Sequence, residues 1–171
     1  KITRFEEIQA WQEARVLVQM VYEAVKANGA FCKDFRLLNQ IQSAAVSCMS
    51  NIAEGFSRRS NKEFVQFLFI SKSSAAEVQS QLYVALDQNY ISQTDFNQIY
   101  TQAETVSKLT SGFIKYLKSM QSPTFHKLNK HNKLNEPNQL YQPNKLNKPY
   151  EPYEPNEPDH LYQPVQLTST K

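Results

Sequence analysis

Two adjacent arginines, Arg58 and Arg59, are the side chains in this sequence best placed to do chemistry. They lie in the stretch SNIAEGFSRRSNKEF, residues 50–64, between the expected end of one helix and the expected start of the next. Free N–H groups and the positive end of the dipole meet at a helix N-terminus, so two guanidinium groups there would gather an anion such as phosphate. The alternative is that they pair with Glu54, Glu63 or a neighbouring subunit.

Catalytic groups are scarce in the first 121 residues. All three histidines follow that point, so no nucleophile–base pair can be built on histidine before it. This part of the chain also has no phosphate-binding glycine loop, no Glu-x-x-His motif of a di-iron bundle and no metal-ligand spacing. A carboxylate pair among Glu54, Glu63 and Glu77 is the remaining acid–base arrangement. We therefore expect no enzymatic activity, no metal and no cofactor.

Apolar residues recur every three or four positions in four segments of the first 121 residues. This near-heptad spacing is typical of helices that cross at shallow angles in a bundle. Connections are short, so consecutive helices must be antiparallel neighbours. The sequence therefore predicts an all-α, up-down-up-down antiparallel four-helix bundle. The expected core positions are Ile8, Trp11, Ala14, Val18, Val21, Val25; Leu38, Ile41, Ala45, Cys48, Ile52; Phe64, Leu68, Ser71, Ala75, Val78, Leu82, Ala85; and Phe96, Ile99, Ala103, Val106, Thr110, Phe113, Leu117.

The helix ends also have sequence signals. Gly29 and Gly55 are predicted to stop the first and second helices, because glycine takes the left-handed C-cap conformation freely. Ser60 followed by Glu63 predicts a capping box at the start of the third helix, and a weaker box is expected at Ser92 for the fourth.

Small and apolar residues exceed what a lone bundle needs. The stretches SAAVSCMSNIAEG, residues 43–55, and SKSSAA, residues 71–76, are mostly small side chains, which let helices approach closely. A helix that is apolar over more than one stripe is covered on more than one side, either by a wide core or by another subunit. The apolar residues outside the expected stripes are Val16, Met20, Tyr22, Val65, Phe69 and Ile70.

Composition divides the chain at about residue 121, because all 8 prolines stand at or after Pro123. Residues 1–121 are the predicted bundle. Residues 122–171 are a predicted disordered, Pro/Asn-rich tail of low complexity, too poor in apolar residues to order itself. Its prolines recur every three or six residues, a spacing that suits a polyproline II helix. The tail is interpreted as an expanded repeat without a selected role, a spacer, or a docking segment.

Charge and cysteine content say less about the partners and the location of the protein. The 19 Lys and Arg against 16 Asp and Glu leave a net charge of +3, which permits nucleic-acid binding without demanding it. Two cysteines without paired spacing suit a reducing compartment. No stretch approaches the roughly 20 apolar residues of a membrane span. The expected location is the cytoplasm.

The stretch AAVSCMSNIAEGFSRRSNKEFVQFLFISKSSAAEVQSQL, together with FEEIQAWQEARVLV near the start, resembles the small four-helix-bundle proteins encoded in intervening sequences of bacterial 23S ribosomal RNA genes. The resemblance covers the chain from residue 4 to about residue 120. Its most specific element is Asn-Ile-Ala-Glu-Gly, then Arg, then a polar cap, here Ser60, and Glu-Phe. The matching positions are Asn51, Ala53, Glu54, Gly55, Arg59, Glu63 and Phe64.

The chain is similar, more distantly, to the accessory proteins of diversity-generating retroelements. That resemblance implies a homo-oligomer, most simply a five-membered ring, with a basic surface for nucleic acid. Two departures stand out: no proline precedes the Asn-Ile-Ala-Glu-Gly run, and Gln42 and Ser43 occupy positions where Arg is common in the family.

The leading hypothesis is a non-catalytic oligomeric protein that contacts the phosphates of RNA or DNA through basic side chains. An alternative is a protein-interaction scaffold, or an accessory subunit of a partner such as a reverse transcriptase. A third is a small-molecule or enzymatic bundle with a polar pocket around Glu54. The candidate basic residues are Arg58, Arg59, Lys62, Lys72, Arg15 and Arg36.

Overall fold

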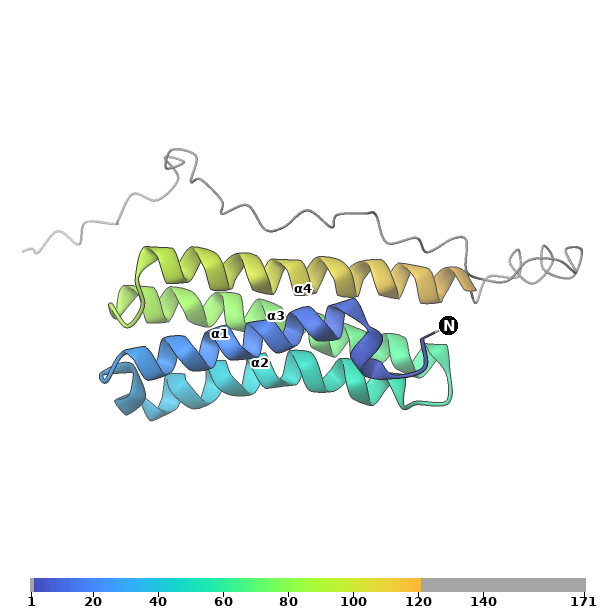
Figure 1. Ribbon diagram of the computed structural model, residues 1–171, viewed down its shortest axis with the longest axis horizontal. Helices are drawn as coiled ribbons and strands as arrows, with labels where there is room; N and C mark the ends of the chain where they lie inside the picture. The colour runs from blue at the N-terminus through green and yellow to red at the C-terminus, as the bar shows by residue number, and fades with distance from the viewer. Residues whose placement is uncertain (1, 121–171) are drawn as a thin grey trace, which may run out of the picture. The chain divides into compact units, whose positions relative to one another are not determined.

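Four long helices packed side by side make up the computed structural model, which describes residues 2–120 (Figure 1). They are α1 (Gln9–Ala27), α2 (Phe35–Phe56), α3 (Asn61–Asp87) and α4 (Gln93–Met120), with the short 3₁₀ turns η1 (Phe5–Glu7) before α1 and η2 (Phe31–Lys33) before α2.

Each helix packs against the next along the chain, and α4 returns to α1. The predicted up-down-up-down bundle is therefore confirmed. The α2–α3 turn, the start of α1 and the end of α4 lie at the same end (Figure 1). The predicted tail, residues 122–171, lies outside the described residues.

The helix ends do not use glycine as predicted. No glycine in the described range has a positive φ: α1 ends before Gly29, and α2 continues through Gly55 to Phe56. The prediction of left-handed glycine caps was wrong. The left-handed residue is Asn89, with φ 56°, directly after α3. The next N–H, from Tyr90, donates to the Ala85 carbonyl over 2.8 Å, which completes a Schellman cap.

The helix starts follow the sequence signals more closely. The Ser60 hydroxyl accepts from the Glu63 N–H at 3.2 Å and donates to the Glu63 carboxylate at 2.7 Å. At α4 the Asp95 N–H donates to the Ser92 hydroxyl, and the Ser92 N–H donates back to the Asp95 carboxylate. The box expected to be the weaker one is therefore the fully reciprocal one.

The core follows the predicted spacing, most closely on α3, where all seven expected residues are buried. On α1, Trp11 and Val18 are only partly buried, and Ala10 and Leu17 take fully internal positions, so the buried stripe is rotated toward them. The apolar residues outside the expected stripes do not all have the same explanation: some belong to a wide core, and others are exposed and open to another subunit. Val65 is buried within the subunit and belongs to a wide core, whereas the exposed residues of the set are Val16, Phe69 and Ile70.

The small-residue stretches of α2 and α3 face each other inside the subunit. The Ser71 hydroxyl donates to the Cys48 carbonyl, and the Ser47 and Ser74 hydroxyls are 2.8 Å apart. Burial raises the pKa of the Cys48 thiol to about 12, so this cysteine stays protonated and packs as a small apolar residue. Close approach of α2 to α3 therefore accounts for these small side chains.

Candidate nucleic-acid interface

The α2–α3 turn is built on close contact between the end of α2 and the start of α3. Gly55 is buried, and a Cβ there would lie 2.5 Å from Cδ2 of Phe64 and 2.8 Å from Cβ of Phe67. The Phe64 ring packs edge-on against Phe56 and, at 5.1 Å between centroids, against Phe113 of α4. Glycine is therefore needed here for helix approach rather than for backbone conformation.

The rest of the signature holds the same corner together. The Asn51 side-chain amide donates to the Ser47 carbonyl at 2.8 Å and to the Ser47 hydroxyl at 3.0 Å. Ile52 is fully buried. Glu54 pairs with Arg58. These contacts lie within the subunit, so Asn51, Ile52 and Glu54 of the signature serve the structure of α2 and of the turn that follows it.

The two arginines of the turn have different surroundings. The Arg58 guanidinium pairs with Glu54 and lies 4.6 Å above the centre of the Phe67 ring. The internal pairing considered as the alternative is therefore present for Arg58. Arg59 is exposed and has no hydrogen-bond or ion-pair partner within residues 2–120. Of the two, Arg59 is the one that can meet an external anion without a carboxylate already paired with it in the described range.

Further cations extend from the turn along α3. Lys62 and Lys72 are exposed and form no ion pair within the described part of the chain. The Nζ of Lys118, on α4, lies 5.0 Å from the centre of the Phe69 ring. Phe69 precedes Lys72 by three residues, which is less than one turn of α3. We call Arg59, Lys62, Lys72 and Lys118 the turn-end cationic surface. Sequence reasoning missed Lys118, because only the pairing of α3 with α4 brings it there.

The other two candidate cations lie apart from this surface. Arg15 is exposed on α1, toward the same end of the bundle, with no ion pair among the described residues. Arg36 stands in the first turn of α2, about 30 Å along that helix from Arg58. Four of the six predicted residues thus gather at one end and along α3, with Arg58 already paired.

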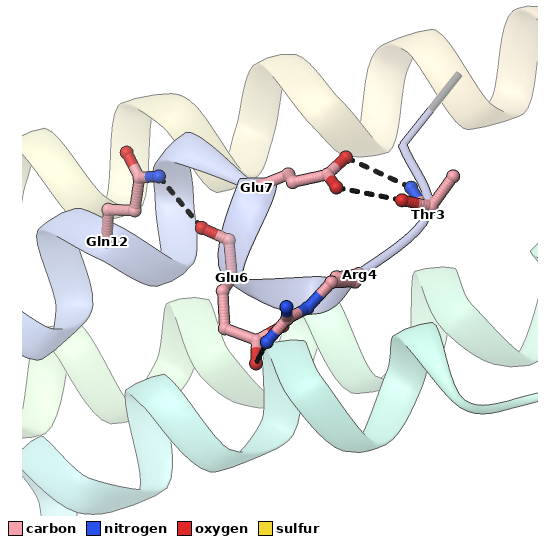
Figure 2. Close-up of polar contacts among 5 residues, drawn as sticks. All are labelled: Thr3, Arg4, Glu6, Glu7 and Gln12. Atoms are coloured by element: carbon pink, nitrogen blue, oxygen red, sulfur yellow. Dashed lines mark hydrogen bonds and ion pairs between the residues drawn. The ribbon is translucent and has the colours of Figure 1, made fainter.

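The N-terminal segment brings another cation, Arg4, to this end and pairs it with an acid (Figure 2). Arg4 pairs with Glu6 at 2.8 Å, and this hydrogen bond lowers the pKa of the Glu6 carboxyl. Glu7 accepts from the Thr3 N–H and hydroxyl, and these bonds lower its pKa as well. The segment closes the start of α1, and between residues 2 and 8 its cation is paired.

The family model described as 23S rRNA-intervening sequence protein matches residues 6–112, which include the whole α2–α3 turn. The chain belongs to this family. A solved structure shares the fold: a protein with unknown function from the S23 ribosomal protein family of Bacteroides thetaiotaomicron VPI-5482, with a TM-score of 0.58 and 22% identity. The match covers 62% of this chain and 98% of that one. No curated protein matches the chain.

Two of the three carboxylates considered for acid–base chemistry already have partners at the turn. Glu54 is held by Arg58, Glu63 is held by its cap, and Glu77 lies about 20 Å from Glu63 along α3. Within residues 2–120, no three His, Cys, Asp or Glu side chains are grouped so as to hold a metal. None of the four helices combines the length and apolar character required to span a bilayer. The described site is a surface of cations at a closely packed corner between α2 and α3.

Proposed function

We propose that this member of the 23S rRNA-intervening sequence family is a non-catalytic, homo-oligomeric cytoplasmic protein that binds the backbone of RNA or DNA. The turn-end cationic surface makes the contacts. The observation that carries the proposal is the difference between the arginines of the turn: Arg58 is held internally, whereas Arg59 is exposed without a partner in the described range. An unpaired cation binds phosphate by releasing counterions and sacrifices no internal contact.

The size of the surface suits a phosphate backbone. Lys62 and Lys72 are ten residues apart on α3, or about 15 Å. Successive phosphates of a strand are about 3.4 Å apart along a duplex axis, so several fall within that length. Glu63 is the acid next to Lys62 in the sequence, and its carboxylate accepts from the Ser60 hydroxyl at the start of α3. In an oligomer the surface repeats once per subunit, and avidity offsets the modest net charge.

Replacing Arg59 and Lys62 with glutamine is expected to weaken binding of unrelated RNA and DNA sequences about tenfold at low salt. The slope of log affinity against log salt should fall by about 1 to 2, because one or two phosphate contacts are lost. Stability should stay within about 0.5 kcal/mol, since both side chains are exposed and have no ion pair within residues 2–120. A salt titration of binding and a thermal melt on the same variant measure both effects.

The matched control replaces Lys26 and Lys33 with glutamine. Both are exposed, unpaired within the described residues and located at the opposite end of the bundle, so the charge change is the same. An equal loss of binding in this control would show that net charge alone is responsible and would contradict the proposed surface. Arg58→Gln should instead lower stability slightly, because it removes the contacts with Glu54 and Phe67.

The outer face of α3 supports the oligomeric part of the proposal. Four of its large apolar side chains are exposed at 42–47%: Phe69, Ile70, Tyr83 and Val84. They extend over both halves of one helix, and a run of exposed apolar side chains on one element often marks an interaction surface. A second copy of the chain covers the side of α3 that carries Ile70 and Val84, whereas Phe69 lies under Lys118 on the side assigned to nucleic acid. The distant resemblance favours a pentamer.

Light scattering at micromolar concentration tests the assembly. The wild-type protein should have the mass of an oligomer, and replacing Ile70 and Val84 with glutamate should yield monomers, because buried charges would lie unpaired in the interface. The matched control places glutamate at Thr94 and Thr101, on the exposed side of α4, and should leave the mass unchanged. Dissociation of the control to the same degree would refute the α3 interface.

The same apolar face also favours a second function, a protein-interaction scaffold whose α3 binds a different protein. In that case the wild-type chain should be a monomer by light scattering, and the Arg59 and Lys62 replacements should leave nucleic-acid binding unchanged. The combination of these two results separates the scaffold from the proposed nucleic-acid-binding oligomer.

A further inference from the structure

A hollow of about 280 Å³ lies on α1, outside the turn-end cationic surface. Its lining combines one aromatic ring, one cation, two amides and one aliphatic side chain, and the residues are Trp11, Gln12, Arg15, Val16 and Gln19. Neither the family signature nor the proposed phosphate contacts at the turn explain this combination.

The aromatic wall of the hollow is held in position by the N-terminal segment. Trp11 is partly buried against the core, and Phe5 meets it edge-on with 5.1 Å between ring centroids. The Gln12 side-chain amide donates to the Glu6 carbonyl at 2.8 Å, which ties α1 to η1 (Figure 2). A ring fixed in this way loses little conformational freedom when a ligand stacks on it.

The polar wall is free to bind. Arg15 and Gln19 are exposed and have no hydrogen-bond or ion-pair partner within residues 2–120. Arg15 follows Trp11 by four residues, so the guanidinium and the indole are neighbours on one face of α1. The hollow therefore offers a stacking surface, a phosphate ligand beside it and an amide one turn further along.

We propose that this hollow binds single-stranded nucleic acid, with one base stacked on Trp11, the adjoining phosphate on Arg15 and a base edge on Gln19. The inference rests on the proposed function and specifies its ligand. A stacking contact needs an unpaired base whose face is open, which a duplex does not offer. Side-chain amides donate to and accept from base edges, and the arginine supplies the positive charge that a strand requires.

Trp11 is the single tryptophan of the chain, so its fluorescence reports on binding at the hollow. Titration of the wild-type protein with an oligouridylate of about ten nucleotides should quench the Trp11 fluorescence, because a base stacks on the indole. A duplex of the same length should bind through the turn-end cationic surface and leave the fluorescence unchanged.

Variants separate stacking from packing. Trp11→Leu should weaken oligouridylate binding about tenfold or more, and Trp11→Phe should recover most of it because it keeps an aromatic face. Arg15→Gln should weaken binding a few-fold and lower the salt slope by about 0.7. Lys26→Gln, on the same helix but outside the hollow, is the matched charge control and should bind as the wild type does. Duplex binding should be unchanged in Trp11→Leu.

The outcomes distinguish this inference from the proposed function. Unchanged fluorescence, together with unchanged oligouridylate affinity in Trp11→Leu, overturns the hollow as a site; the proposed function then survives if the Arg59 and Lys62 replacements still weaken binding. Absence of binding to both single strands and duplexes removes the proposed function and this inference together. If Trp11→Leu lowers the melting temperature, its loss of binding is not informative, and Trp11→Phe and Arg15→Gln are compared instead. An oligouridylate affinity equal to that of the wild type in Arg15→Gln would then overturn the site.

Discussion

Gly55→Ala is expected to lower the free energy of unfolding by about 2 kcal/mol or more, although alanine is the better helix former. The new Cβ would lie 2.5 Å from Cδ2 of Phe64 and 2.8 Å from Cβ of Phe67. The Phe67 Cβ is attached to the α3 backbone, so the clash is relieved only if α2 and α3 move apart at the turn. Chemical denaturation followed by circular dichroism measures the loss.

Gly112 provides the matched control, because it also lies inside a long helix. An added Cβ there meets nothing within 4 Å, and the residue is exposed on α4. Gly112→Ala should therefore raise the stability by about 0.5 to 1 kcal/mol, which is the ordinary helix-propensity gain. The two substitutions should have opposite signs. If Gly55→Ala also stabilises the protein, the close approach of α2 and α3 is not what requires glycine at the turn.

Ser71→Leu is expected to cost about 3 kcal/mol, the second large effect. Ser71 is fully buried on α3 and its hydroxyl donates to the Cys48 carbonyl of α2 at 2.8 Å. Leucine adds a branched side chain between two closely spaced helices and removes that hydrogen bond. Overpacking a core costs about 1 to 3 kcal/mol, and a lost internal hydrogen bond adds about 1 kcal/mol. A denaturant midpoint at unchanged slope gives the difference.

A leucine placed at an exposed serine shows whether the cost of Ser71→Leu comes from the buried position or from the larger side chain alone. Ser50 lies on the outer side of α2, so Ser50→Leu should change the stability by no more than about 0.5 kcal/mol. Ser71→Ala, which removes only the hydrogen bond, should cost about 1 kcal/mol. Equal effects of leucine at Ser71 and Ser50 would disprove the view that the small residues serve the α2–α3 contact.

Gly55→Ala and Ser71→Leu are also expected to affect function, because both disturb the packing of α2 against α3. The contact between α2 and α3 holds the corner from which Arg59 and Lys62 project, and Arg58 is fastened to that corner by Glu54 and Phe67. A variant that loosens the corner is expected to lose nucleic-acid binding together with stability. Replacement of Arg59 and Lys62 should weaken binding without changing stability. The two classes of variant therefore separate the structural role of the α2–α3 turn from its contacts with phosphate.

Local features of the chain were predicted well from the sequence, because they depend on neighbours three or four residues away. The apolar spacing placed the four helices, and the serine signals at Ser60 and Ser92 marked two helix starts. The family signature could also be recognised from consecutive residues and is confirmed by the match over residues 6–112. Helix periodicity and capping chemistry are encoded in short stretches, which explains this success.

Contacts between helices were decided only by the tertiary structure. Gly55 was expected to end a helix through its backbone, and instead it makes room for Phe64 and Phe67 of α3. Arg58 and Arg59 look equivalent in sequence, yet one lies over the Phe67 ring and the other has no partner within the described residues. These differences depend on side chains from another helix and on the rotation of each helix about its axis, which periodicity alone leaves open by tens of degrees.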